Sequence, residues 1–235
     1  MSDWESIQHD VEQDILAQQQ QYEEASKESA LEQCIYLYVE GESEEIAFRI
    51  LLEEGLGINF SELGIIIVNY NGIGNLKHAI RIMSQTLSHD RPMIFTFDDD
   101  DKPLIARLGG LANNIHLFKV PYSPTITLPD GQKGGSFEES FEPSDFIDAC
   151  FETTLLKMNP QVSKAEFTNT FIEDKSFYSQ IVKFLQSKGL ANDRPNKIEI
   201  AESMATCCIT EPETYIELAK LIKDIRLNNP VNVKI

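Results

Sequence analysis

The stretch CIYLYVEGESEE at residues 34–45 decides the fold, together with PMIFTFDDDD at residues 92–101. Each stretch starts with an apolar and aromatic run and ends in a series of carboxylates. A short, continuous apolar run is typical of a strand that is buried on both faces of a parallel sheet. Both stretches therefore indicate strands whose carboxyl ends are strongly acidic.

Two further runs have the same apolar character, GIIIVNY at residues 64–70 and IHLFKV at residues 115–120. The segments between the four runs have the composition of helices and cover residues 41–57, 75–90 and 102–111. Strands that alternate with helices predict a parallel sheet with right-handed crossovers. The expected class is therefore α/β, a sheet of about four parallel strands flanked by helices.

Residues 1–32 predict one long helix, because they lack Gly and Pro and are rich in Glu, Gln and Ala. Apolar residues are sparse along it and fade toward its end. Two interpretations stay open. The helix packs on its own domain, or it binds a partner, which includes a second copy of the chain.

The texture changes again after residue 120. Residues 121–136 are rich in Pro, Gly and polar residues and predict a long loop. Most of the chain beyond it has helical character, with helices expected at 174–189, 197–208 and 212–227. We therefore expect three parts: the N-terminal helix at 1–32, an α/β core at 33–142, and a helical extension at 143–235 that packs on the core.

Composition narrows the classes of protein that the chain can represent. No apolar run approaches the roughly 20 residues of a membrane span, and the acidic N-terminus is unlike a signal peptide. The four cysteines form no CxxC pair, which argues against a structural zinc site. We expect a cytoplasmic protein without a membrane partner.

The formal charge of −18 conflicts with simple nucleic-acid binding, which usually relies on basic residues. Three explanations stay open. Bound divalent metal ions offset the charge at one site, a partner protein supplies the grip, or basic residues cluster locally. Candidates for such a cluster are Lys77, Arg81, Lys183, Lys188, Arg194 and Lys197.

Carboxylates follow the predicted strands at the edge where α/β sheets bind ligands. Glu40 ends the first strand and Glu44 opens the next helix, while Asp98 and Asp100 follow the third strand with the same orientation. Converging carboxylates are the ligands that Mg²⁺ and Mn²⁺ prefer. Each motif alone also fits a plain acidic helix start or a solvated turn. Their order at successive strand ends favours a metal site.

This order of motifs resembles the Toprim family, over about residues 33–142. VEGESE at 39–44 is similar to its Glu-Gly motif, and FDDDD at 97–101 is similar to its Asp-x-Asp motif. The family includes topoisomerases, bacterial primases and the OLD-type (overcoming lysogenization defect) nucleases. The OLD-type domain is the nearest resemblance. It also has counterparts of the GIGNLK turn at 72–77, of Thr96, of the pair Glu138 and Glu139, and of Lys197.

The resemblance implies a Toprim Rossmann-like fold and a nuclease that uses Mg²⁺ or Mn²⁺ to hydrolyse DNA or RNA. It implies catalytic roles for some residues and metal ligation by others. Thr96 would orient the scissile phosphate or a ligand carboxylate, and Lys197 would stabilise charge on the phosphate. The implied catalytic residues are Glu40, Asp98, Asp100, Thr96 and Lys197, and the implied metal ligands are Glu40, Glu44, Asp98, Asp100, Glu138 and Glu139.

OLD-type nucleases also carry an ABC-type ATPase domain, and this sequence has no GxxxxGK[ST] phosphate loop. We therefore expect a stand-alone Toprim subunit whose ATPase partner, of ABC or SMC type, is a separate chain. The resemblance suggests a role in anti-phage defence. A topoisomerase or primase fragment is disfavoured, because neither the tyrosine-bearing gate nor a zinc module is visible. An interaction or effector subunit of a larger complex remains the alternative.

Overall fold

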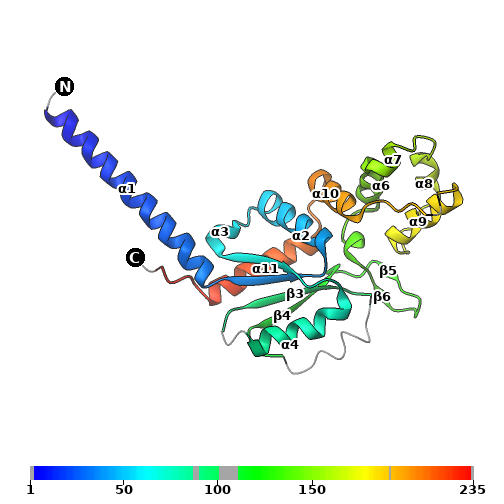
Figure 1. The fold of residues 1–235 in the computed structure, drawn as a ribbon, viewed down its shortest axis with the longest axis horizontal. Helices are drawn as coiled ribbons and strands as arrows, with labels where there is room; N and C mark the ends of the chain where they lie inside the picture. The colour runs from blue at the N-terminus through cyan, green and yellow to red at the C-terminus, as the bar shows by residue number, and fades with distance from the viewer. Residues whose placement is uncertain (1–2, 87–89, 101–110, 191, 234–235) are drawn as a thin grey trace.

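The centre of the computed structural model, which describes residues 3–86, 90–100, 111–190 and 192–233, is a four-stranded parallel sheet (Figure 1). The prediction of an α/β fold with four parallel strands is confirmed, and the strand bounds agree to within about one residue. The strands are β1 (Ile35–Val39), β2 (Ile65–Asn69), β3 (Met93–Asp98) and β4 (Ile115–Val120).

The strand order is β2-β1-β3-β4, so β1 lies between β2 and β3. In the register, Ile35 of β1 pairs with Ile65 of β2, and Tyr36 of β1 pairs with Met93 of β3. This order brings the ends of β1 and β3 next to each other. The two acidic motifs, more than fifty residues apart in the sequence, therefore meet at one edge.

Both faces of the sheet are covered, which explains why its strands are apolar along their whole length. Met93, Phe95 and Phe97 of β3 face one side, where they join a cluster with residues of α4 (Leu76–Thr86). Ile94 of β3 faces the opposite side and belongs to a larger cluster. Asp98 follows this second face by the alternation of the strand.

The larger cluster is formed with helices from both halves of the chain. The segment expected as one helix over 41–57 begins as an α-helix and continues as a π-helix. The expected helix over 102–111 lies outside the described residues, apart from its last residue. The helices and turns of this first half are α2 (Glu42–Arg49), η1 (Ile50–Gly55), α3 (Phe60–Leu63) and η2 (Ile73–Asn75).

The C-terminal part is mostly helical and shares the larger hydrophobic cluster with the sheet, so the two are continuous in packing. The stretch expected as a loop at 121–136 contains a small antiparallel hairpin. Where one domain ends and the next begins stays a prediction. The elements here are β5 (Ile126–Thr127), β6 (Lys133–Gly134), η3 (Phe137–Ser140), α6 (Pro143–Glu152), α7 (Thr154–Lys157), α8 (Lys164–Thr170), α9 (Phe177–Ser187), α10 (Lys197–Cys207) and α11 (Glu213–Asn228).

Helix α1 (Asp3–Glu32) is a single long helix that extends away from the rest of the molecule (Figure 1). Its last turns are anchored, because Ala30 is buried and its carbonyl lies where a side chain at Gly64 would otherwise stand. Closer to the N-terminus of the helix, Ile15 and Tyr22 are about half exposed. Among the described residues, no helix combines the length and the apolar character that crossing a bilayer requires.

Candidate active site

The carboxyl ends of the strands border a cavity of about 330 Å³. Its walls come from the β1–α2 turn, the turn after β2, the end of β3, the η3 turn and the start of α10. In α/β sheets this edge is where ligands bind, so this cavity is the candidate site. It is lined by Glu40, Gly41, Ser43, Glu44, Asn71, Gly72, Asp98, Phe137, Glu138 and Lys197.

Glu40 is held by backbone amides from the ends of the two neighbouring strands. Its Oε1 accepts a hydrogen bond from the amide of Ile73 at 3.0 Å, and its Oε2 accepts one from the amide of Asp98 at 3.2 Å. Burial raises the pKa of Glu40, the two amides lower it, and the charge of Asp100 raises it again. The net pKa lies above the ordinary value, while the carboxylate is fixed in position.

Glu44 lies in the first turn of α2, where the helix begins directly after Gly41. It is only 8% exposed. Burial raises the pKa of Glu44 to about 7, and the charges of Glu40 and Glu138 contribute. The next residue, Glu45, instead accepts a hydrogen bond from the Asn69 side chain at 3.0 Å. The two adjacent glutamates therefore have different surroundings, and only Glu44 lines the cavity.

The aspartates after β3 also differ in position. Asp98 is half-buried in the cavity wall, and burial followed by the charges of Glu40 and Glu44 raises its pKa well above the usual value. Asp99 is buried and does not line the cavity. Asp100 is exposed and lies outside the lining, although its charge contributes to the raised pKa values of Glu40 and Asp98.

Glu138 and Glu139 are neighbours in the η3 turn, but their side chains lie in different surroundings. Glu138 lines the cavity, and its Oε1 lies 2.9 Å from the Nζ of Lys197. Glu139 is buried outside the cavity, where its Oε2 closes a capping box with the amide of Ser136 at 2.7 Å and its Oε1 accepts from the amide of Phe177 at 2.6 Å. Both Glu139 oxygens thus accept from backbone amides at the start of η3 and of α9. The Oε2 of Glu138 accepts from the Ser136 hydroxyl at 2.9 Å, and Glu138 is the member of the pair that lines the cavity.

Among the residues that the structure describes, Lys197 is the only basic side chain that lines the cavity. Its Nζ lies 4.6 Å from the ring centre of Tyr178, whose hydroxyl donates a hydrogen bond to the carbonyl of Pro195 at 2.8 Å. Burial lowers the pKa of Lys197, but the charge and hydrogen bond of Glu138 and the charge of Asp98 outweigh it, so the pKa is raised. Lys197 is therefore a stable cation at neutral pH.

Thr96 is not brought to the cavity. Its hydroxyl donates to the carbonyl of Tyr38 at 3.2 Å, one strand away, and the side chain is buried within the sheet. The pleat turns Thr96 to the same face as Asp98, but a full residue pair deeper. As oriented, the Thr96 hydroxyl supports the pairing of β3 with β1.

Several cavity residues were not among those predicted from the sequence. Ser43 and Phe137 carry no local pattern that distinguishes them. Asn71 and Gly72 have positive φ angles of 57° and 96°. The Asn-Gly pair after a predicted strand does signal such a turn, and here the turn delivers the Ile73 amide to Glu40. Tyr178, which lies under Lys197, gives no signal in the sequence.

The donor chemistry of the cavity fits a hard divalent cation, because four carboxylates face it. Burial raises the pKa values of Glu40, Glu44 and Asp98, and the charges of neighbouring carboxylates contribute to the rise. Within the described ranges, however, no three acidic, His or Cys side chains are close enough to form a preassembled metal site. The donor set therefore fits, and its side chains would have to draw together around an ion.

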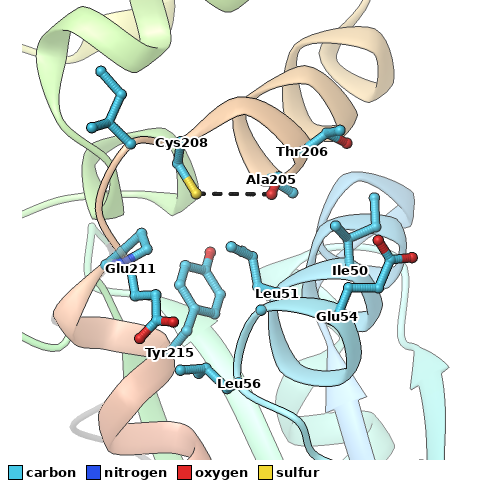
Figure 2. Close-up of a pocket in the computed structure, with 12 residues that line it drawn as sticks. Ile50, Leu51, Glu54, Leu56, Ala205, Thr206, Cys208, Glu211 and Tyr215 are labelled. Atoms are coloured by element: carbon cyan, nitrogen blue, oxygen red, sulfur yellow. Dashed lines mark hydrogen bonds between the residues drawn. The ribbon is translucent and has the colours of Figure 1, made fainter.

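A second cavity, of about 340 Å³, lies between η1, the end of α10 and the start of α11 (Figure 2). Figure 2 shows Leu51, Leu56 and Tyr215 around it, and Cys208 with its thiol toward the carbonyl of Ala205. It shares no lining residue with the first cavity and has no basic residue in its lining. Its lining combines apolar side chains with Glu54, Thr206 and Glu211 and lacks the convergent set of carboxylates that marks the first cavity.

A parallel sheet whose neighbouring strands end in a Glu-Gly motif and an Asp-x-Asp motif has the arrangement of a Toprim domain. Residues 35–100 match the family model described as "Overcoming lysogenization defect protein-like, TOPRIM domain". The predicted resemblance to the Toprim domain of OLD-type proteins is confirmed for this part of the chain.

One solved structure extends the likeness in fold beyond that domain. The C-terminal region of the Burkholderia pseudomallei OLD protein has a TM-score of 0.51 at 18% identity, and the match covers 81% of this chain and 96% of that one. The C-terminal region of the Xanthomonas campestris pv. campestris OLD protein has a TM-score of 0.49 at 16% identity, covering 83% and 97%. Among curated proteins, no significant match was found.

Proposed function

We propose that the chain is a metal-dependent nuclease, which hydrolyses phosphodiester bonds of DNA or RNA with Mg²⁺ or Mn²⁺. The observation that carries the proposal is the lining of the strand-end cavity. Four carboxylates from three segments of the chain line the cavity together with one lysine, and the pKa values of three of them are raised. Perturbed carboxylates that converge in a cleft are typical of catalytic and metal sites.

The proposed ligands are the carboxylates that line the cavity, Glu40, Glu44, Asp98 and Glu138. The exposed Asp100 would contribute charge from the outside. A bound divalent ion supplies positive charge for the carboxylates, polarises a phosphoryl oxygen and lowers the pKa of a water molecule.

The chain's own groups have separable tasks in this proposal. Glu40 keeps its orientation because two backbone amides hold its oxygens. Lys197, supported by Tyr178, places a cation where negative charge develops on the phosphate. Glu139 holds η3 in place and so positions Glu138. We assign neither Glu139 nor Thr96 direct contact with metal or substrate.

The test is cleavage of labelled duplex DNA, single-stranded DNA and RNA by the full chain with Mg²⁺ or Mn²⁺. We expect Glu40→Ala and Asp98→Ala to abolish cleavage and to weaken Mn²⁺ binding measured by calorimetry. Glu45→Gln is the matched control, because Glu45 neighbours Glu44 but faces Asn69. Undiminished cleavage in both alanine variants would refute the assignment.

The finer parts of the proposal concern the cellular setting. We propose a cytoplasmic role in anti-phage defence, following the resemblance to OLD-type proteins. We also propose an ATPase partner of ABC or SMC type, following the same resemblance to OLD-type proteins. Co-purification of the chain with such an ATPase, and nucleotide-dependent cleavage by the pair, would support this.

A second candidate function is an interaction or effector subunit that works only inside a complex. Helix α1 favours it, since Ile15, Leu16 and Tyr22 are each about half exposed on an extended helix. This helix is also the proposed route to a homo-oligomer. Light scattering with size-exclusion chromatography tests it: Ile15→Gln/Leu16→Gln/Tyr22→Gln should convert an oligomer to a monomer. A wild-type monomer that cleaves DNA unaided argues against this candidate.

A further inference from the structure

The segment 175–197 is basic in a chain that is otherwise acidic. It contains five of the twenty basic residues and a single acidic one, Asp193, whereas the whole chain has a formal charge of −18. It covers the end of the loop before α9, the helix itself and the turn that leads to α10. Its basic residues are Lys175, Lys183, Lys188, Arg194 and Lys197.

The five cations differ in whether a carboxylate forms an ion pair with them. Lys175, Lys183 and Arg194 are exposed, and none forms an ion pair within the part of the chain that the structure describes. The other two are paired: Lys188 lies 2.6 Å from Glu166, and Lys197 lies 2.9 Å from Glu138. The unpaired cations give the segment a net positive potential toward solvent.

The segment is attached to the wall of the acidic cavity at two points. The amide of Phe177, at the start of α9, donates to Glu139 at 2.6 Å, directly beside the cavity residue Glu138. The hydroxyl of Tyr178 donates to the carbonyl of Pro195 at 2.8 Å, which ties α9 to the turn before Lys197. The segment is therefore joined to the cavity wall through the start of α9 and through the turn before Lys197.

We propose that the segment 175–197 binds the phosphodiester backbone of the nucleic-acid substrate and guides it to the cavity. The inference rests on the proposed nuclease function and adds the place where the substrate is held. Carboxylates of the cavity repel phosphate at short range, so attraction must come from cations at its rim. Basic side chains that neutralise phosphates release condensed counterions, which supplies most of the affinity for a polyanion.

The experiment measures binding of fluorescent duplex DNA, single-stranded DNA and RNA to the full chain by anisotropy, in EDTA and again in Ca²⁺. The test variant is Lys175→Gln/Lys183→Gln/Arg194→Gln. The matched control is Lys27→Gln/Lys220→Gln/Lys223→Gln, which removes the same charge from exposed lysines of α1 and α11. Comparing the three affinities shows whether the segment prefers the backbone of duplex DNA, of single-stranded DNA or of RNA.

We expect the test variant to bind about tenfold more weakly or worse at moderate salt, and the control to bind within about twofold of wild type. The slope of log affinity against log salt should fall by about two to three for the test variant, one unit or slightly less per lost phosphate contact. Circular dichroism and thermal melting establish that both variants are folded.

The inference is overturned by a test variant with wild-type affinity and salt slope, or by a wild-type chain that binds none of the three nucleic acids at low salt. A concentration-dependent dimer that the test variant abolishes also overturns it, because the acidic α1 of a second copy would then occupy the segment. Failure of the nuclease proposal is distinct, since it appears as binding without cleavage in Mg²⁺ or Mn²⁺.

Discussion

The strand-end cavity and the segment 175–197 lie side by side and carry opposite charge. Four carboxylates and one lysine line the cavity, while the segment has five basic residues and one aspartate. A group of carboxylates that can hold a divalent ion also repels phosphate, so attraction for a polyanion has to be located elsewhere. Under the two proposals, reaction and attraction are divided between the two regions, and a formal charge of −18 describes neither of them.

The largest effect is expected from a substitution that changes the cavity and leaves the segment 175–197 intact. Asp98→Asn should lower cleavage by at least about 100-fold, because it removes a charged ligand while it preserves shape. Nucleic-acid binding in EDTA should be unchanged or tighter, since a repelling charge is lost. Single-turnover cleavage and anisotropy measure the two. If binding falls together with cleavage, the division between the two regions is wrong.

Lys197 lines the cavity and is also the last residue of the segment 175–197, so its replacement tests which of the two regions it serves. Lys197→Met should lower cleavage by about 10- to 100-fold, through loss of charge stabilisation on the phosphate. It also leaves Glu138 without its ion pair. Adding Glu138→Gln should restore the melting temperature but not cleavage. Recovery of cleavage in the double variant would mean that Lys197 acts only by holding Glu138.

Replacing the cations that form no ion pair in the described ranges should change KM, whereas replacing cavity residues should change kcat. Lys175→Gln/Lys183→Gln/Arg194→Gln should raise KM for cleavage about tenfold and leave kcat nearly unchanged, because these residues bind substrate equally in the ground and transition states. Steady-state kinetics at fixed salt measures both constants. A fall in kcat with constant KM would move these residues from attraction to the reaction itself.

The smallest effect concerns stability and pH. The pKa of Glu44 is about 7 in the folded protein, above its ordinary value of 4.5, so the folded state binds this proton more tightly. Protonation of Glu44 therefore stabilises the folded state fully below its ordinary pKa of 4.5, and this stabilisation is lost as the pH rises through about 7. The free energy of unfolding of the metal-free protein should fall through Glu44 by on the order of 1 kcal/mol from about pH 5 to pH 8.

Urea denaturation in EDTA checks this expectation. Glu44→Gln should flatten the pH dependence, whereas Glu45→Gln should leave it as in the wild type. Mn²⁺ should restore stability at the upper end of the range, because it favours the ionised carboxylates. If Glu44→Gln kept the wild-type pH dependence, ionisation of Glu44 would not lower the free energy of unfolding, and the expectation would be wrong.

Local sequence predicted the strands well, because each is a continuous apolar run that ends in turn residues or carboxylates. It predicted the helix over 41–57 only in part, since the π-helical turn of η1 depends on packing around Leu51 and Leu52. The hairpin β5–β6 was expected as loop, because its two-residue strands are too short to leave a pattern.

The sequence by itself determined which residue types stand at the strand ends, since periodicity and strand length depend on neighbours along the chain. Only the tertiary structure decided which of them share a cavity. Glu138 faces it and Glu139 does not, because the capping box of η3 engages Glu139. Likewise, only folding attaches the segment 175–197 to this wall, through Phe177 and Tyr178. Such contacts join residues far apart in the chain, and no local pattern encodes them.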